Sequence, residues 1–133
     1  MILAIDASER DRMLFGLVDG KKITATCVPL ADSSFDVLDG AVQFLQRHRS
    51  TLSSVRTLIV VQGPGRFSGL RLTSVLANTL HWSEGTTIMT VRGGVRGETA
   101  KERIVYMQEH AFSTKSVKPF YGKPPSITKP RKS

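Results

Sequence analysis

A buried strand followed at once by a glycine-rich turn and a helix constrains this chain more than any other stretch. The strand is the apolar run Thr57 to Val61 within residues 56–62, which is typical of a central parallel strand. The turn is Gly63-Pro64-Gly65-Arg66-Phe67-Ser68-Gly69, and the pattern after it predicts a helix over residues 68–82. A buried strand that leads into a helix predicts an α/β fold.

The remaining elements agree with that fold class. Strands are predicted over residues 1–7, 12–18, 23–29 and 86–91, and Asp19-Gly20 marks a hairpin turn between two of them. A helix capped by Ser33 or Ser34 is expected to run to about Arg49. The resulting order, β-β-β-α-β-α-β, predicts a mixed five-stranded sheet with helices packed on it. This order resembles the ribonuclease-H-like N-lobe of the actin-like ATPases.

Composition suggests one small domain and a separate tail. Residues 1–92 are predicted to form the lobe, and residues 93–112, broken by glycines, a linker or a short helix over 98–112. Residues 113–133 are predicted to form an extended, basic, proline-rich tail. Residues 111–133 carry six Lys and Arg and no acid, whereas the other 110 residues hold 13 basic and 11 acidic side chains. Contact of this tail with phosphates and simple solvation of the tail are equally compatible with that charge.

The sequence has no stretch typical of a membrane-spanning helix or a signal peptide, and it contains a single cysteine. No stretch approaches the roughly 20 apolar residues of a membrane-spanning helix. The first residues have no basic segment and place an acid at Asp6, so no signal peptide is expected and we expect a cytoplasmic protein. Cys27 is the only cysteine and lies in an apolar run, which favours a buried small hydrophobe over a reactive thiol.

Both predicted helices carry more apolar side chains than one sheet face needs. In the first, the apolar positions include Val37 and Phe44 and cover about half of the helical wheel. In the second, the polar face is narrow and consists of Arg71, Ser74, Asn78 and His81. Apolar surface beyond what the sheet can cover predicts a helix–helix interface with a partner.

The glycine turn has two interpretations. Backbone N–H groups at a helix N-terminus can hold a phosphate, but the Lys-Ser or Lys-Thr pair of a Walker A loop is missing. The turn does not match the GxGxxG pattern either. A tight turn set by backbone geometry is therefore the favoured interpretation, and phosphate binding stays open.

Two segments taken together resemble the TsaB (YeaZ) family. The first is Met1-Ile2-Leu3-Ala4-Ile5-Asp6-Ala7-Ser8, and the second is Gly63-Pro64-Gly65-Arg66-Phe67-Ser68-Gly69-Leu70-Arg71. The family's signatures read approximately ILAIDTS and GPGSFTGLR, and residues 117–128 are similar to its C-terminal segment. Arg66 and Ser68 depart from the family's serine and threonine, and Thr73, Val75 and Thr79 stand where the family favours small residues. The family's second lobe is represented by only about twenty-five residues.

The resemblance implies a non-catalytic subunit without a cofactor. TsaB-like proteins bind TsaD, which places threonylcarbamoyl on the adenosine beside the anticodon of certain tRNAs, and the ATPase TsaE completes the bacterial set. Self-pairing in the absence of TsaD and tRNA contact through the tail are further expectations. The structural turn residues are Gly63, Pro64, Gly65, Phe67, Ser68 and Gly69. The expected partner-binding residues are Val37, Leu38, Ala41, Phe44, Leu45, Arg71, Leu72, Val75, Leu76 and Thr79.

Two other functions compete with this one. A small actin-like enzyme would hold a nucleotide near Asp6, although Asp6 is better suited to bonding local backbone N–H groups. A nucleic-acid-binding module would act through the tail. The three histidines are widely separated, so neither a metal site nor a Ser-His-Asp triad is expected.

Overall fold

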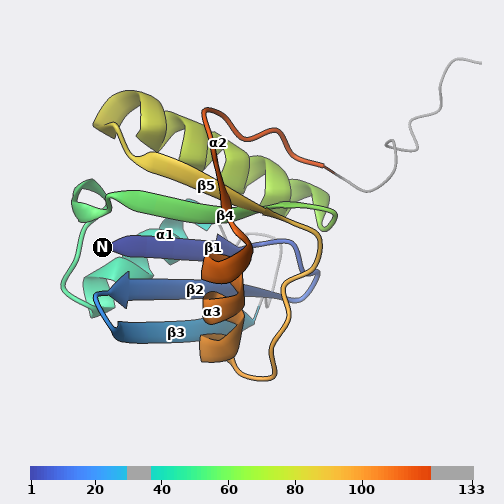
Figure 1. Cartoon of the computed structure of the whole chain (residues 1–133), viewed down its shortest axis with the longest axis horizontal. Helices are drawn as coiled ribbons and strands as arrows, with labels where there is room; N and C mark the ends of the chain where they lie inside the picture. Colours follow the sequence, from blue (N-terminus) through green and yellow to red (C-terminus); the bar gives the residue numbers. More distant parts are fainter. Residues whose placement is uncertain (30–36, 121–133) are drawn as a thin grey trace, which may run out of the picture.

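A six-stranded mixed sheet forms the centre of the molecule (Figure 1). The computed structural model describes residues 1–29 and 37–120. The strand order across the sheet is β3-β2-β1-β4-β5-β6, with β1 parallel to β4, β4 parallel to β5, and the other pairs antiparallel. The strands are β1 (Ile2–Asp6), β2 (Arg12–Asp19), β3 (Lys22–Pro29), β4 (Thr57–Gly63), β5 (Thr87–Arg92) and β6 (Phe112–Thr114). The predicted mixed sheet is confirmed, and β6 adds one strand to the five expected.

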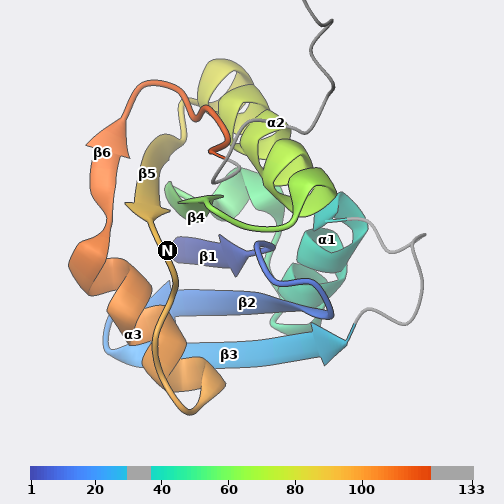
Figure 2. The ribbon, with the colours of Figure 1, turned by 90° about the vertical axis from the view of Figure 1, so that its right-hand side faces the viewer.

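Helices cover both faces of this sheet. Helices α1 (Val37–Arg47) and α2 (Phe67–Glu84) lie on one face, and α3 (Ala100–His110) lies on the other (Figure 2). A short 3-10 helix, η1 (Leu52–Ser54), precedes β4. The predicted caps Ser33 and Ser34 lie outside the described residues. The first helix ends at Arg47, two residues before the predicted Arg49.

Two apolar cores follow from this layering. Leu3 and Ile5 of β1 point into the core under α1 and α2, while Ala4 between them points into the core under α3. Because side chains alternate along a strand, a central strand covered on both faces must be apolar at every position. This explains the unbroken apolar runs of β1 and β4 that the sequence shows.

Helix α3 settles the interpretation of residues 93–112. Thr99 Oγ1 accepts a bond from the backbone N–H of Glu102 at 3.1 Å, and the Glu102 carboxylate accepts one from the N–H of Thr99 at 3.0 Å. This reciprocal cap satisfies two N–H groups at the start of the helix. A Cβ at Gly16 of β2 would overlap the side chain of Ile104, so the glycine allows α3 to lie close to the sheet. Of the two predicted alternatives, a linker or a short helix, residues 100–110 therefore form the helix, and it packs on the sheet.

The segment after α3 belongs to the fold as far as residue 120. Phe112–Thr114 pairs with β5, and Val117 is buried in the core under α2. Asn78 of α2 holds the backbone of Val117 from both sides, because its Nδ2 donates to the carbonyl at 3.1 Å and its Oδ1 accepts from the N–H at 2.8 Å. The prediction of an extended tail is therefore wrong for residues 113–120, and residues 121–133 lie outside the described part.

Cys27 also differs from its prediction. Its side chain is exposed on β3, which is an edge strand of the sheet. The apolar run around it indicated a buried strand, but an edge strand has fewer neighbours to cover its faces. In the described residues no helix is long and apolar enough to cross a membrane.

Candidate partner-binding surface

The glycine turn packs directly on the end of β1. A Cβ at Gly69 would overlap the carbonyl oxygen of Ala7, and a Cβ at Gly65 would overlap the backbone and side chain of Ser8. Only glycine allows backbones to approach this closely without displacing one of them. These two glycines therefore set the distance between the start of α2 and β1.

Gly63 has the same role on the other side of the turn. Its φ is 128°, a value that side chains rarely tolerate, and an added Cβ would overlap the carbonyl oxygen of Phe120. Its own carbonyl accepts a bond from the N–H of Gly93 at 2.8 Å. The peptide bond to Pro64 is cis. The turn is thus fixed against β1, against the residue after β5 and against the C-terminal segment.

Arg66, which stands where the TsaB family has serine, ties the turn to the loop after β1. Its backbone N–H donates to the carbonyl of Ser8 at 2.7 Å, and its Nε donates to the carbonyl of Glu9 at 3.1 Å. Its Nη1 donates to Ser68 Oγ at 3.0 Å. These donors are engaged within the chain, which favours the tight-turn interpretation over a phosphate cradle. The side chain of Phe67 is outside the described part.

Asp6 closes the end of β1 as predicted. Its Oδ1 accepts bonds from the backbone N–H of Ser8, at 2.9 Å, and from the Ser8 hydroxyl. Burial raises the pKa of Asp6 above its ordinary value, and the bonds from Ser8 oppose that shift. The pKa of nearby Glu9 is lowered, chiefly by its bond from Arg12 and also by Arg103. The two carboxyl groups are thus held by local partners.

Most of the α1 residues assigned to a partner interface are buried in the fold. Val37, Ala41, Phe44 and Leu45 are at most 4% exposed and pack in the core under α1 and α2. The prediction that Val37 and Phe44 exceed what the sheet can cover is wrong, because the Phe44 ring stacks on Phe15 of β2 with centroids 5.8 Å apart. Of the assigned α1 residues, only Leu38 is exposed, at 44%.

Helix α2 turns part of its polar face inward. Ser74 is buried and its hydroxyl donates to the carbonyl of Leu70 at 2.8 Å, while Asn78 holds Val117. Leu76, assigned to the interface, is only 9% exposed and packs in the core. The predicted polar face of α2 is therefore wrong at two of its four positions, and Leu76 is a core residue.

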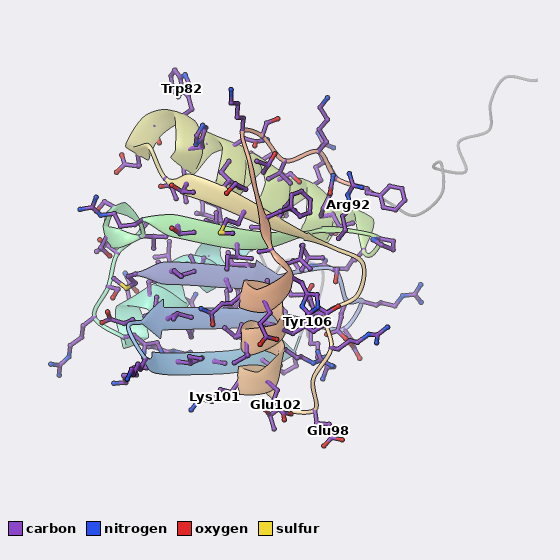
Figure 3. The ribbon with its side chains drawn as sticks, viewed as in Figure 1. Trp82, Arg92, Glu98, Lys101, Glu102 and Tyr106 are labelled. Carbon is purple, nitrogen blue, oxygen red and sulfur yellow. The ribbon has the colours of Figure 1, made fainter. Side chains whose placement is uncertain are left out.

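The opposite side of α2 carries exposed apolar side chains in a line. Leu72 is 42% exposed, Val75 56% and Trp82 87%. Figure 3 shows Trp82 pointing away from the sheet. Residues spaced three, four and seven apart share one face of a helix. We call this exposed face of α2 the outer stripe. It consists of these three apolar residues together with two exposed polar ones, Arg71 and Thr79.

The outer stripe differs from the sequence-based assignment in two respects. Trp82 was absent from the predicted interface, although its spacing of seven from Val75 places it on the same face. Of the positions where the TsaB family favours small residues, Thr73 and Ala77 are buried in the fold. Only Val75 and Thr79 of that set are on the surface.

The described residues bring no three His, Cys, Asp or Glu side chains together in an arrangement that could hold a metal ion. The imidazole nitrogens of two histidines lie near backbone carbonyls instead. His81 Nδ1 is 2.8 Å from the carbonyl of Thr86, and His110 Nδ1 is 2.9 Å from that of Tyr106. His48 packs edge-on against the Phe44 ring at 4.8 Å.

Comparison with solved structures identifies the fold. YeaZ from Pseudomonas aeruginosa superposes with a TM-score of 0.60 and 20% identity over 68% of this chain and 44% of its own length. The fold is that of YeaZ. A second structure, an uncharacterized protein with similarity to peptidase YeaZ from Pseudomonas aeruginosa, gives 0.59 and 21% identity over 68% of this chain.

This chain spans less than half of either structure, 44% of the first and 42% of the second. No protein-family model matches the sequence, and no curated protein matches it significantly. The agreement is therefore one of fold.

Proposed function

We propose that this chain is a shortened TsaB-like scaffold subunit that binds a TsaD-like enzyme of tRNA threonylcarbamoyladenosine synthesis. The observation that carries the proposal is the outer stripe, a line of exposed apolar side chains on a helix of a YeaZ fold. Large apolar side chains that gather on one surface typically mark an interface. The nature of the partner follows from the resemblance of residues 1–8 and 63–71 to TsaB.

Within the outer stripe, Trp82 is the expected anchor. Tryptophan is enriched among the residues that dominate binding energy, because it buries a large area with few rotatable bonds. Leu72 and Val75 would surround it with further apolar contact. Arg71 and Thr79 would form a polar rim, as in most interfaces between proteins that also exist apart.

The proposed role is one of positioning and involves no chemistry by this chain. The carboxylate of Asp6 and the guanidinium of Arg66 are engaged by Ser8, Glu9 and Ser68, which supports a structural use of the turn. The chain would need no cofactor and would work in the cytoplasm, where tRNA is modified. A TsaE-like ATPase would join through the complex.

The same surface would allow self-pairing when the enzyme is absent. An interface between two identical copies is most often two-fold symmetric, so the outer stripe of one copy would meet that of the other. A stable interface needs about 800 Å² from each side, so the contact must extend beyond the stripe to other surface residues. The dimer and the complex with the enzyme would then exclude each other.

Size-exclusion chromatography with the TsaD-like protein of the same genome tests the proposal. The double variant Leu72→Glu and Val75→Glu places two charges on the stripe and keeps good helix formers. It should weaken the complex by more than about 2 kcal/mol, which is roughly 30-fold in Kd.

The matched control is Phe112→Glu, which adds a charge at an apolar side chain that is 45% exposed on β6 and does not belong to the outer stripe. It should co-elute with the enzyme as the unaltered chain does. Normal co-elution of the folded double variant would show that α2 is not the interface.

A further inference from the structure

A basic hollow lies where α1 ends beside the β2–β3 hairpin, close to the N-terminus marked in Figure 1. Its volume is about 250 Å³. Its charged side chains are Lys22 of β3, Arg47 at the end of α1, Arg49 just beyond it, and one acid, Asp19; His48 also lines it. None of the exposed large apolar side chains lines this hollow.

Among the described residues, salt bridges join only Glu9 to Arg12 and to Arg103. Within this part of the chain, Asp19 therefore makes no ion pair with Lys22, Arg47 or Arg49. Arg47 has a local benefit, since a cation is favourable at the negative end of a helix. That benefit does not account for Lys22, which comes from another element.

Arg49 occupies a backbone position that favours glycine. Its φ is 57°, and the N–H of Ser50 donates to the carbonyl of Leu45 at 2.8 Å, which is the closing bond of a Schellman turn. Glycine is the usual residue there, because any Cβ is crowded in the left-handed region. Arginine thus stands where glycine would suit the fold better. A side chain found in a disfavoured backbone conformation points to a function for that side chain.

We propose that this basic hollow binds the phosphodiester backbone of a nucleic acid. Two arginines and one lysine line a space large enough for phosphate groups, and guanidinium groups bind phosphate in a bidentate manner. Unpaired cations of this kind bind nucleic acid by releasing its counterions. A membrane-binding surface would need apolar side chains beside the cations, and the hollow has none of the exposed ones.

The hollow is separate from the outer stripe, since the two share no residue. The inference therefore stands whether or not a TsaD-like partner binds α2. It also differs from the tail hypothesis, because Lys22, Arg47 and Arg49 belong to the folded lobe. The class of ligand is set by the phosphate chemistry, and no base-specific contact is implied.

Fluorescence anisotropy with a labelled 20-nucleotide RNA of mixed sequence, from 50 to 200 mM salt, tests the inference on the full chain. The triple variant K22Q/R47Q/R49G should bind about tenfold more weakly at the lowest salt. The slope of log K against log salt should become shallower by about 2, as expected when three phosphate contacts are lost.

The single variant R49G separates binding from folding. Glycine suits the left-handed position, so the thermal midpoint should stay the same or rise, while affinity falls about two- to fivefold. A fall in affinity together with a lower midpoint would overturn the argument from Arg49.

Two further variants serve as controls. R96Q/K101Q/K115Q removes three exposed cations outside the hollow, of which Lys101 of α3 is labelled in Figure 3, and should leave the salt slope within about 0.5 of the unaltered chain. Equal weakening by this control and by the hollow triple variant would overturn the inference. Loss of binding only in the tail variant K123Q/K129Q/R131Q/K132Q would overturn it in favour of the tail.

Binding of the chain and of the triple variant to anionic vesicles of phosphatidylserine and phosphatidylcholine is measured as a further comparison. The proposal predicts that K22Q/R47Q/R49G binds RNA about tenfold more weakly. If that variant instead loses only vesicle binding and keeps its affinity for RNA, the hollow recognises a membrane and the proposal fails.

Discussion

Helices α1 and α2 lie on the same face of the sheet, yet they use their apolar residues differently. In α1 the apolar positions Val37, Ala41, Phe44 and Leu45 are buried. In α2 apolar residues lie on both sides, with Leu70, Ala77 and Leu80 in the core and Leu72 and Val75 exposed. Both helices carry more apolar residues in sequence than one sheet face needs, but α2 keeps three exposed large apolar side chains after folding, whereas α1 keeps only Leu38.

The reason lies in what each helix packs against. The apolar face of α1 is filled by β2 and by α2, and Phe44 lies between Phe15 and His48. On α2, Ser74 and Asn78 point inward, where the backbone of Leu70 and of Val117 satisfies them. Because these polar residues face the protein interior, apolar residues such as Leu72 and Val75 remain on the outer side of α2. The width of an apolar surface in sequence therefore does not tell which part of it is exposed.

The largest expected difference between the helices is in stability. Leu45→Ala in α1 removes a fully buried side chain and should lower the free energy of unfolding by about 2–5 kcal/mol. Leu72→Ala in α2 should change it by less than about 0.5 kcal/mol, as for other surface substitutions. Urea denaturation of both variants measures the difference. Similar losses would mean that the outer stripe is packed against the chain itself.

The next effect concerns the inward polar residues of α2. Asn78→Ala leaves the N–H and carbonyl of Val117 without their partner and should cost about 1–3 kcal/mol. Amide exchange of Val117 should become faster at the same time. Thr79→Ala, the exposed neighbour, is the control and should be close to neutral. An unaltered exchange rate in Asn78→Ala would contradict the docking of residues 115–120 on α2.

The smallest effects distinguish the ends of the two helices. Both end in a left-handed residue, Arg49 after α1 and Gly85 after α2, with φ of 57° and 70°. Gly85→Ala meets no atom within 4 Å, so its cost of about 1 kcal/mol is backbone strain alone. Arg49→Gly should have the opposite sign, with a gain of about 0.5–1 kcal/mol. Thermal unfolding measures the stability change of both variants. A lower stability of Arg49→Gly would show that the two helix ends do not differ in this way.

The sequence was sufficient for the sheet and the turn. The apolar run Leu58 to Val61 of β4 predicted a central parallel strand, and the apolar run at the start of the chain predicted that β1 is buried. The glycines of the turn predicted a tight turn, and in the structure Gly65 and Gly69 also allow it to lie close to Ser8 and Ala7. Local chemistry decides these features, so they can be predicted from local sequence.

Tertiary packing decides the features that the sequence did not predict. Strand β6 is three residues long and forms only because β5 offers an open edge. Val117 is buried because Asn78, 39 residues earlier, holds its backbone. The partner-facing side of α2 could not be assigned from the helical wheel, because two polar residues turn inward to bind main chain.

Trp82 offers the most direct test of the outer stripe as a partner interface, because it is the only tryptophan of the chain and is 87% exposed. The chain can be labelled with 5-fluorotryptophan and observed by fluorine NMR while the TsaD-like enzyme is added. We predict that the resonance shifts and loses its sensitivity to replacement of H₂O by D₂O, because the indole becomes buried. A complex in which Trp82 keeps the chemical shift and solvent sensitivity of the free chain, or the absence of any complex, would contradict the account.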